Sequence, residues 1–348
     1  MTADRPAFPA GRRYRALSAY LRERYGGKVR SVTIDAGFTC PNVDGTVTTG
    51  GCVYCDNRSF SPNRRLPRTS VTAQIDRGVT ILTKRYGAEQ FLAYFQAGTN
   101  THGKLDRLRR VYEEAVAHPR ILGLTVGTRP DSLPDPVLDL LEEFARRKPV
   151  CLELGLQTIH DRSLDWMNRG HHVDAFYDAV DRCRGRALEL CAHVILGLPG
   201  ESRADMLATA DVLAALPVHG VKIHNLYVVK DTPLEQMVRA GEVRTLELAE
   251  YVPLVCDFLE RLPPAMVVHR LSGDGPPPFL VAPAWCLDKP RLLRAVDQEF
   301  VDRDSWQGKQ FLPGRAVGRP GERATRTALP LLASAKTRDV GVGASQPD

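Results

Sequence analysis

The chain has 348 residues, of which 43% are hydrophobic, enough to bury a large core in one barrel-sized domain. No apolar run reaches the roughly 18 residues that a membrane-spanning helix needs, so we expect no membrane partner. The N-terminal stretch MTADRPAFPAGRRYR lacks the apolar segment of a secretory signal. Eight cysteines without such a signal predict a reducing, cytoplasmic location and argue against a disulfide framework.

The formal net charge of +6 is unevenly distributed along the chain. Residues 1–30 hold eight basic and two acidic side chains, whereas residues 31–313 hold 33 basic and 36 acidic ones. A basic N-terminal arm on a mildly acidic body indicates a polyanionic partner. A terminus that only improves solubility has the same composition, and both interpretations stay open at this point.

A short helix is expected first, in SAYLRERYG, ending at Gly26. Six β-rich apolar runs then alternate with stretches of helical character. Strands are expected at 29–35, 91–96, 121–126, 150–156, 191–198 and 221–229. Helices are expected at 71–86, 104–117, 135–147, 173–188 and 202–215, and in pieces over 233–260. Ser202 and Asp205 have the spacing of a capping pair at a helix start.

Strand–helix repeats of this kind predict an α/β fold with a parallel sheet covered by helices. Six units fit a partial (β/α)6 TIM-like barrel, although a doubly wound sheet has the same alternation; in both, chemistry belongs at the carboxyl ends of the strands. We divide the chain into a basic arm (1–28), the core (29–262), a capping extension rich in glycine and proline with a helix at 290–303 (263–312), and a tail expected to be disordered (313–348).

Three cysteines, Cys40, Cys52 and Cys55, lie in the loop that follows the first predicted strand. Thiolates are the usual ligands of a cubane iron–sulfur cluster, which has four irons, so three cysteines leave one iron open to bind a small molecule. A structural zinc site would need four ligands, and no second cysteine pair follows. Zinc and three unrelated structural cysteines remain as alternatives to the iron–sulfur cluster.

The run GFTCPNVDGTVTTGGCVYC resembles the cluster loop of YtqA/YhcC-type proteins of the radical S-adenosylmethionine (SAM) superfamily, which are similar to elongator and coproporphyrinogen dehydrogenase-like enzymes. These proteins widen the usual first cysteine gap to eleven residues, as in this chain. The likeness extends over further segments at 91–103, 152–172, 193–202, 221–234, 269–285 and 304–311. It therefore covers most of the chain, from about residue 10 to 312.

The resemblance implies a radical SAM barrel with a [4Fe–4S] cluster held by Cys40, Cys52 and Cys55. The amine and carboxylate of S-adenosylmethionine would occupy the fourth iron. One electron, from a donor such as flavodoxin or ferredoxin, would then cleave SAM reductively to a 5′-deoxyadenosyl radical that abstracts hydrogen from a substrate.

The resemblance also implies cofactor-binding positions. Tyr54, directly before the last cysteine, takes the aromatic place beside the adenine, with loop packing as its alternative role. Gly98 and Thr99 end the second strand, where backbone and small residues bind the methionyl amine. This chain lacks the common Gly-Gly-Glu form there.

Gln157 and Arg169 lie in LGLQT…NRGH, which resembles the block that holds the ribose and the carboxylate of SAM in related enzymes. A guanidinium matches a carboxylate bidentately, so Arg169 is the expected partner of that carboxylate. Glu153 points to the same strand face as Gln157 and is either a cofactor ligand or the buried partner of a strand neighbour. His193 is either a ribose contact or a core residue.

For this branch of the family the resemblance suggests a tRNA substrate, at the side chain of a modified wobble uridine. The basic arm, Arg58 and the cluster Arg64, Arg65 and Arg68 would suit contacts with phosphates. Two alternatives remain: a radical SAM enzyme acting on a small carboxylate or porphyrin-like metabolite, and a non-catalytic zinc-binding protein.

Overall fold

The computed structural model describes residues 6–273 and 275–314. The tail expected to be disordered, residues 313–348, lies outside the described part from residue 315 onward. Seven strands form one parallel sheet in the order β1-β2-β3-β4-β5-β6-β8. Their bounds are β1 Val29–Ile34, β2 Gln90–Phe95, β3 Ile121–Thr128, β4 Val150–Gln157, β5 Leu188–Leu196, β6 Gly220–Asn225 and β8 Val267–Arg270.

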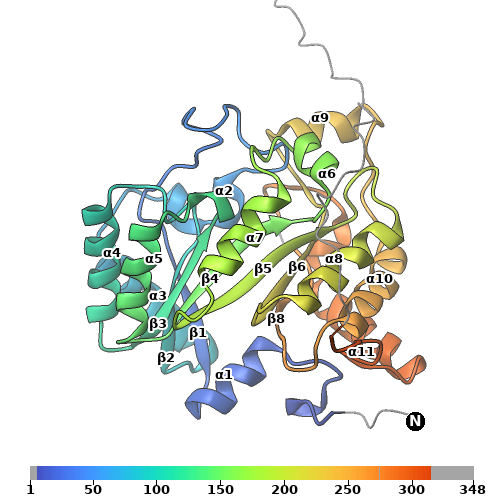
Figure 1. The fold of residues 1–348 in the computed structure, drawn as a ribbon, viewed down its shortest axis with the longest axis horizontal. Coiled ribbons are helices and arrows are strands. Elements are labelled where there is room, and N and C mark those ends of the chain that lie inside the picture. Colours follow the sequence, from blue (N-terminus) through green and yellow to red (C-terminus); the bar gives the residue numbers. More distant parts are fainter. Residues whose placement is uncertain (1–5, 274, 315–348) are drawn as a thin grey trace, which may run out of the picture.

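The sheet curls without closing, and helices cover its convex face (Figure 1). The longer helices are α3 Val71–Tyr86, α4 Leu105–Ala117, α5 Asp135–Ala145, α7 Val173–Arg182, α8 Arg203–Ala215, α10 Leu248–Arg261 and α11 Lys289–Asp302. Shorter helices are α1 Leu17–Tyr25, α2 Asn57–Phe60, α6 Asp161–Trp166 and α9 Pro233–Arg239. Two short strands, β7 Val228–Val229 and β9 Leu280–Ala282, pair antiparallel outside the main sheet. The predicted partial parallel barrel is thus confirmed.

The barrel has one strand more than the six predicted. β8 lies within the segment assigned to the C-terminal extension and pairs parallel with β6. It is only four residues long and stands beside a run rich in glycine and proline, so its apolar pattern is too short to recognise. The sixth predicted strand, 221–229, was too long: β6 ends at Asn225, and Val228–Val229 pairs with β9 instead.

The other differences concern where elements end. The helix predicted over 173–188 ends at Arg182, because Gly185 adopts a left-handed conformation (φ 75°) in the turn before β5. The strand predicted from residue 191 begins at Leu188. The stretch 233–260 forms two helices, α9 and α10, and Pro253 lies inside the second.

The core lies between the convex face of the sheet and its helices. Phe95 of β2, Tyr112 of α4 and Phe144 of α5 meet edge to face, with ring centroids 5.2 and 5.8 Å apart. Tyr112 also donates a hydrogen bond to the carbonyl of Asn100, just beyond β2. This packing fixes the strand ends on which the cysteine loop rests.

The basic N-terminal segment packs partly against the sheet. Tyr14, Ala19 and Leu21 are buried, and Ala16 forms a bridge with Val268 of β8. The helix α1 therefore lies below the gap between the two edge strands, β1 and β8, at the amino ends of the strands (Figure 1).

Every helix in the described part is too short or too polar to cross a bilayer.

The predicted capping pair at the start of α8 is confirmed. The Ser202 hydroxyl accepts a hydrogen bond from the Asp205 amide at 3.2 Å, and the Asp205 carboxylate accepts one from the Ser202 amide at 2.8 Å. We expect Ser202→Ala to lower the free energy of unfolding by about 1 kcal/mol, because it leaves a helix-end amide without its acceptor. Urea unfolding measures this loss. Ser202→Thr keeps the acceptor and is the control; an equal loss in both variants would contradict the capping role.

Candidate active site

All ten residues predicted to bind the cluster or SAM line one cavity of about 500 Å³ toward the carboxyl ends of the strands. They are Cys40, Cys52, Tyr54, Cys55, Gly98, Thr99, Glu153, Gln157, Arg169 and His193. They come from the loop after β1, from the strands β4 and β5, and from the segments that follow β2 and α6. The fold therefore brings together residues that are far apart in the sequence, while their individual roles stay predictions.

The cysteine loop is anchored to the segment after α6 by two asparagines. The Asn42 amide group donates hydrogen bonds to the carbonyls of Asn168 and Arg169, at 2.6 and 2.8 Å. In return, the Asn168 amide group donates to the carbonyls of Thr49 and Gly51, at 3.1 and 2.8 Å. These reciprocal contacts hold the eleven residues between Cys40 and Cys52 in one place.

The sulfur of Cys52 has two nearby donors. The Asn42 Nδ2 and Arg169 Nη1 atoms each lie 3.6 Å from Cys52 Sγ. Cys55 is next to it in space, and burial together with the neighbouring Cys52 and Cys40 raises the pKa of the Cys55 thiol. A metal cluster binds cysteines as thiolates, so a bound cluster would remove this opposition to ionisation at Cys55.

Arg169 brings a buried positive charge to the same cavity. Its side chain donates to the Gly155 carbonyl from Nη2 at 2.9 Å, while its Nε lacks a hydrogen-bond partner in the described structure. A Cβ on Gly155 would lie 2.5 Å from that Nη2, so a larger residue there would displace the guanidinium from this position. A buried guanidinium beside cysteine sulfurs, with an unused donor, fits an anionic group bound in the cavity.

Gln157 ends β4 in a conformation that non-glycine residues rarely adopt, with φ 73°. The strand pairing with β5 shifts its register between Gly155 and Gln157 at this point. Backbone strain of this kind is found preferentially at functional sites, where it orients a side chain. The strain therefore supports the predicted role of Gln157 as a cofactor contact.

Gly98 and Thr99 hold the backbone that precedes the first cysteine. The Thr99 amide donates to the Thr39 carbonyl at 2.8 Å. Gly98 has φ 73°, and a Cβ there would lie 2.5 Å from the Phe38 carbonyl oxygen. Gly98 therefore lets the backbone after β2 pack directly against the cysteine loop.

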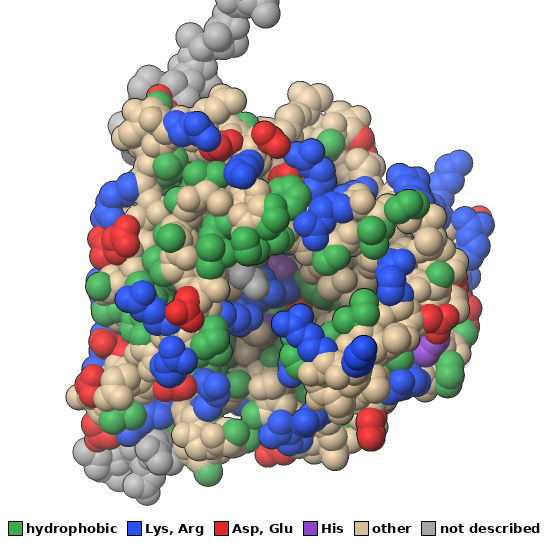
Figure 2. Space-filling view, turned by 180° about the vertical axis from the view of Figure 1, so that it is seen from behind, with side chains coloured by type: hydrophobic (Ala, Val, Ile, Leu, Met, Phe, Trp, Pro, Cys, Tyr) green, Lys and Arg blue, Asp and Glu red, His purple; other side chains and the backbone are tan. Residues whose placement is uncertain are grey.

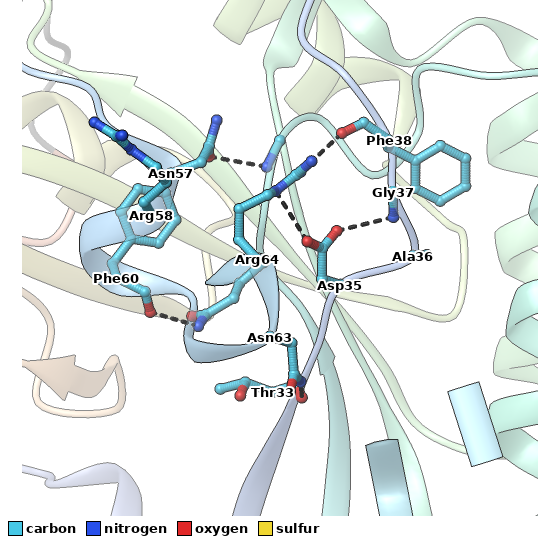
Figure 3. Close-up of polar contacts among 12 residues, drawn as sticks. Thr33, Asp35, Ala36, Gly37, Phe38, Asn57, Arg58, Phe60, Asn63 and Arg64 are labelled. Atoms are coloured by element: carbon cyan, nitrogen blue, oxygen red, sulfur yellow. Dashed lines mark hydrogen bonds and ion pairs between the residues drawn. The ribbon is translucent and has the colours of Figure 1, made fainter. Parts of the chain in front are cut away.

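The segment after Cys55 folds back over the ends of β1 and β2 (Figure 3). The Asn57 side chain accepts a hydrogen bond from the Gly98 amide at 3.1 Å, and Phe60 accepts one from Gln96 at 2.9 Å. Arg64 donates to the Phe38 carbonyl at 3.0 Å and pairs with Asp35 at 2.9 Å. Arg64 therefore stabilises the loop. We expected this side chain to contact phosphate, but it is already engaged by Asp35 and by the Phe38 carbonyl.

Glu153 lies at the centre of a buried polar network on the concave face of the sheet. Its carboxylate accepts from Tyr94 at 2.6 Å and from Lys222 at 2.7 Å. His193 and His269 are 2.9 and 3.4 Å away. Burial alone raises the pKa of Glu153, but Lys222 and His193 outweigh it and hold the pKa well below its usual value.

Burial and the positive charge of Lys222 lower the pKa of His193 to about 4. Glu153 thus makes the contacts of a buried ion-pair partner, and it also lines the cavity. The cofactor-binding roles of Glu153 and His193 stay predictions, since their observed contacts are with each other and with neighbouring strands.

The zinc alternative does not fit the geometry. Four-coordinate zinc, with Zn–S bonds of about 2.3 Å, brings its ligand atoms within about 4 Å of one another. Among the described residues, the group whose potential ligand atoms all lie within 4.8 Å is Glu153, Cys191 and His269, and the three loop cysteines do not form such a group. In the group of Glu153, Cys191 and His269, the Lys222 ammonium already neutralises the Glu153 carboxylate.

Sequence reasoning missed two residues that position this site, Asn42 and Arg129. Arg129 is almost fully buried, donates to the Arg169 carbonyl at 2.8 Å and pairs with Asp131 at 2.7 Å. Together with Asn42 it fixes the backbone that carries Arg169. The available signal was position: Asn42 is two residues after Cys40, and Arg129 directly follows β3.

Comparisons with known proteins agree with this geometry. The profile of the Radical SAM superfamily matches residues 45–213, and that of the Radical_SAM C-terminal domain matches residues 218–302. The first match begins between Cys40 and Cys52, so the first predicted cluster ligand lies just outside it. YtqA of Bacillus subtilis is 40% identical over 86% of this chain and 93% of its own length. YhcC of Escherichia coli is 38% identical over 86% of this chain and 94% of its own.

More remote similarities reach proteins with longer chains. The tRNA uridine(34) acetyltransferase of Dehalococcoides mccartyi is 28% identical over 52% of this chain, which spans 39% of that protein. The solved structure of Elp3 from Methanocaldococcus infernus superimposes with a TM-score of 0.58 at 17% identity, covering 80% of this chain and 64% of Elp3. The structural similarity concerns the fold alone.

We predict that Gly98→Ala impairs the cysteine loop. The left-handed conformation and the clash with the Phe38 carbonyl together should cost about 2–5 kcal/mol of unfolding free energy and reduce the iron bound after reconstitution. Gly87→Ala is the matched control, because Gly87 has a similar φ of 62° and a Cβ there would meet only the flexible end of Lys28, at 4.0 Å. Iron content and urea unfolding measure the two variants. Equal iron binding in both would show that Gly98 does not position the loop.

We also predict that Glu153→Gln destabilises the fold by about 3–5 kcal/mol, because it leaves the buried Lys222 ammonium without its counter-ion. The double variant Glu153→Gln/Lys222→Met should recover most of that loss, since it removes both charges. Urea unfolding of both single variants and of the double variant completes this double-mutant cycle. Losses that simply add would mean that the two side chains do not interact in solution.

Proposed function

Because this chain belongs to the radical SAM superfamily, in the group that contains YtqA and YhcC, we propose that it modifies tRNA by radical chemistry at the side chain of the wobble uridine. The observation that carries the radical chemistry is the cavity where three cysteines meet Arg169 and Gln157. The proposal of tRNA as substrate has separate support, given below.

Enzymes of this superfamily use a [4Fe–4S] cluster and SAM, and the residues of the cavity fit both. Cys40, Cys52 and Cys55 would hold three irons and leave the fourth to SAM. When bound, the two cofactors supply hydrogen-atom abstraction after the uptake of one electron. The electron would come from a small donor protein such as flavodoxin or ferredoxin.

Arg169 and Gln157 would orient SAM within this cavity. The guanidinium of Arg169 has an unused Nε donor and matches the geometry of a carboxylate, so it would fix the methionyl end. Gln157, at the end of β4 with its strained backbone, would contact the ribose side. Tyr54 would lie beside the adenine. Orientation by several fixed groups keeps the reacting bond in one position relative to the cluster.

The choice of tRNA is supported by two remote relatives and by charge. The tRNA uridine(34) acetyltransferase similarity covers half of this chain, and Elongator complex protein 3 of Homo sapiens is 26% identical over 46% of it. Basic residues also surround the catalytic cavity, although Arg58 pairs with Asp56 and Arg64 with Asp35. Arg65 and Arg68 are the arginines of that cluster that remain exposed for phosphate contacts.

The test combines the purified protein with a strain that lacks the gene. Reconstituted and reduced protein should form 5′-deoxyadenosine from SAM, and Cys55→Ala should form none, because one cluster ligand is lost. Mass spectrometry of tRNA nucleosides should show a changed wobble-uridine profile in the deletion strain. The wild-type gene should restore that profile, and the Cys55→Ala gene should not.

The test of the radical chemistry and the test of the tRNA substrate can fail independently. Colourless protein with stoichiometric zinc and no iron would contradict the radical chemistry. An unchanged wobble-uridine profile, with 5′-deoxyadenosine still formed, would reject tRNA and favour a small carboxylate or porphyrin-like metabolite as substrate.

A further inference from the structure

A second and larger cavity, of about 1220 Å³, lies on the concave face between the edge strands β1 and β8. It adjoins the cysteine cavity, because both share Tyr94, Gln96, Glu153, Lys222 and Arg270 in their walls. Figure 2 shows this face of the molecule, with a central hollow bordered by lysine and arginine side chains. We call this opening the lateral cleft. A substrate lying in it can place one group beside the cysteine cavity.

The lateral cleft is strongly basic. Its walls contain eight lysine or arginine residues and two acidic residues, Glu153 and Glu189. Both acids are already paired, Glu153 with Lys222 and Glu189 with Arg24. Six of the basic residues lie toward its rim: Arg15, Arg24, Arg30, Arg65, Arg85 and Lys289. The excess of positive charge favours a ligand that carries several negative charges.

Three of these arginines stack on aromatic rings. The Arg30 guanidinium carbon lies 4.5 Å from the ring centre of Tyr86, and Arg85 lies 5.2 Å from the same ring. Arg65 lies 5.2 Å from the ring of Phe279. All three arginines are exposed, and no carboxylate of the described residues forms an ion pair with them. Their charges are therefore available to an anion.

The same combination recurs on α1, at the lower edge of the cleft. Arg15 and Arg24 lie 5.4 and 5.8 Å from the ring centre of Tyr20, and Arg24 lies 5.4 Å from that of Tyr25. Arg15, Tyr20, Arg24 and Tyr25 of the N-terminal segment thus line the cleft. Arginine and tyrosine side by side offer both of the interactions that an unpaired nucleotide strand uses, phosphate pairing and base stacking.

We propose that the lateral cleft binds a single-stranded RNA segment of the substrate, with its phosphates on the rim arginines and its bases against the tyrosines. This inference rests on the proposed function, because it takes RNA as the substrate, and it adds the surface that holds it. The bound strand runs from the amino-end edge near Tyr86 and α1 toward Tyr94 and Lys222, where the cleft meets the cysteine cavity.

Size and shape favour an unpaired strand over other anions. The cleft exceeds the roughly 300–1,000 Å³ of a typical small-molecule site, so a phosphorylated metabolite would leave much of it empty. In a duplex the base faces are stacked on one another and cannot reach tyrosine rings, whereas bases of loops can. An anticodon loop offers such bases.

The test measures binding of an anticodon stem-loop RNA to the full chain over a range of about 50–200 mM salt. The variant Arg30→Glu/Arg65→Glu/Arg85→Glu should bind at least about tenfold more weakly, and its slope of log K against log salt should fall by about 2, since each lost single-strand phosphate contact removes about 0.7. Arg22→Glu/Arg110→Glu/Arg294→Glu changes the net charge equally outside the cleft and should bind like the wild type.

Each other outcome overturns part of the proposal. Equal weakening in both triple variants would mean that net charge alone binds RNA. Unchanged binding in the cleft variant would place the RNA elsewhere and leave the proposed function standing. A wild-type chain that binds no RNA would overturn both.

A second measurement does not depend on whether the triple variant folds. RNA carrying photoreactive thiouridine in its loop should crosslink the wild-type chain at peptides containing Tyr86 or Tyr20. Crosslinks confined to peptides outside the lateral cleft would overturn the assignment.

Discussion

The incomplete closure of the parallel sheet is the constraint on which the rest of the structure depends. Because β1 and β8 do not pair, the concave face remains open to one side instead of filling with apolar side chains as in a closed barrel. Polar residues can therefore occupy its interior, provided that they satisfy one another. The Glu153 network does so, with Tyr94, Lys222, His193 and His269 arriving from β2, β6, β5 and β8. An open interior and a satisfied polar centre together make room for two cofactors and a substrate.

The shape of the cysteine cavity depends on hydrogen bonds between the backbone segments that carry its residues. Asn42 and Arg129 both donate to the carbonyl of Arg169, and Asn168 donates back to the cysteine loop. Gly98 lets the end of β2 approach the backbone just before Cys40. The positions of the sulfurs and of the guanidinium are thus set by the same few hydrogen bonds, so that a change in one of them shifts both.

Sequence reasoning reached the fold class, because strand periodicity is a local signal, and the ten residues that it predicted to bind the cluster or SAM are all among those that line the cysteine cavity. It missed β8, whose four residues are too short to show a pattern, and it extended β6 over Val228–Val229, which pair elsewhere. It also assigned Arg64 to phosphate, although the residue pairs with Asp35 across the loop. Asn42 and Arg129 were missed for the same reason: their roles arise from contacts between segments that are over 30 residues apart, such as the one between Arg129 and Arg169 at a separation of 40.

The anchoring of the cysteine loop has a consequence for how this protein relates to its metal. In small zinc domains the metal supplies the folding energy, and its removal unfolds the chain. Here the loop is held by protein hydrogen bonds on both sides, and a large apolar core lies on the far face of the sheet. Loss of iron and loss of structure are therefore separate events. Oxygen damage to the cluster would therefore leave the chain folded.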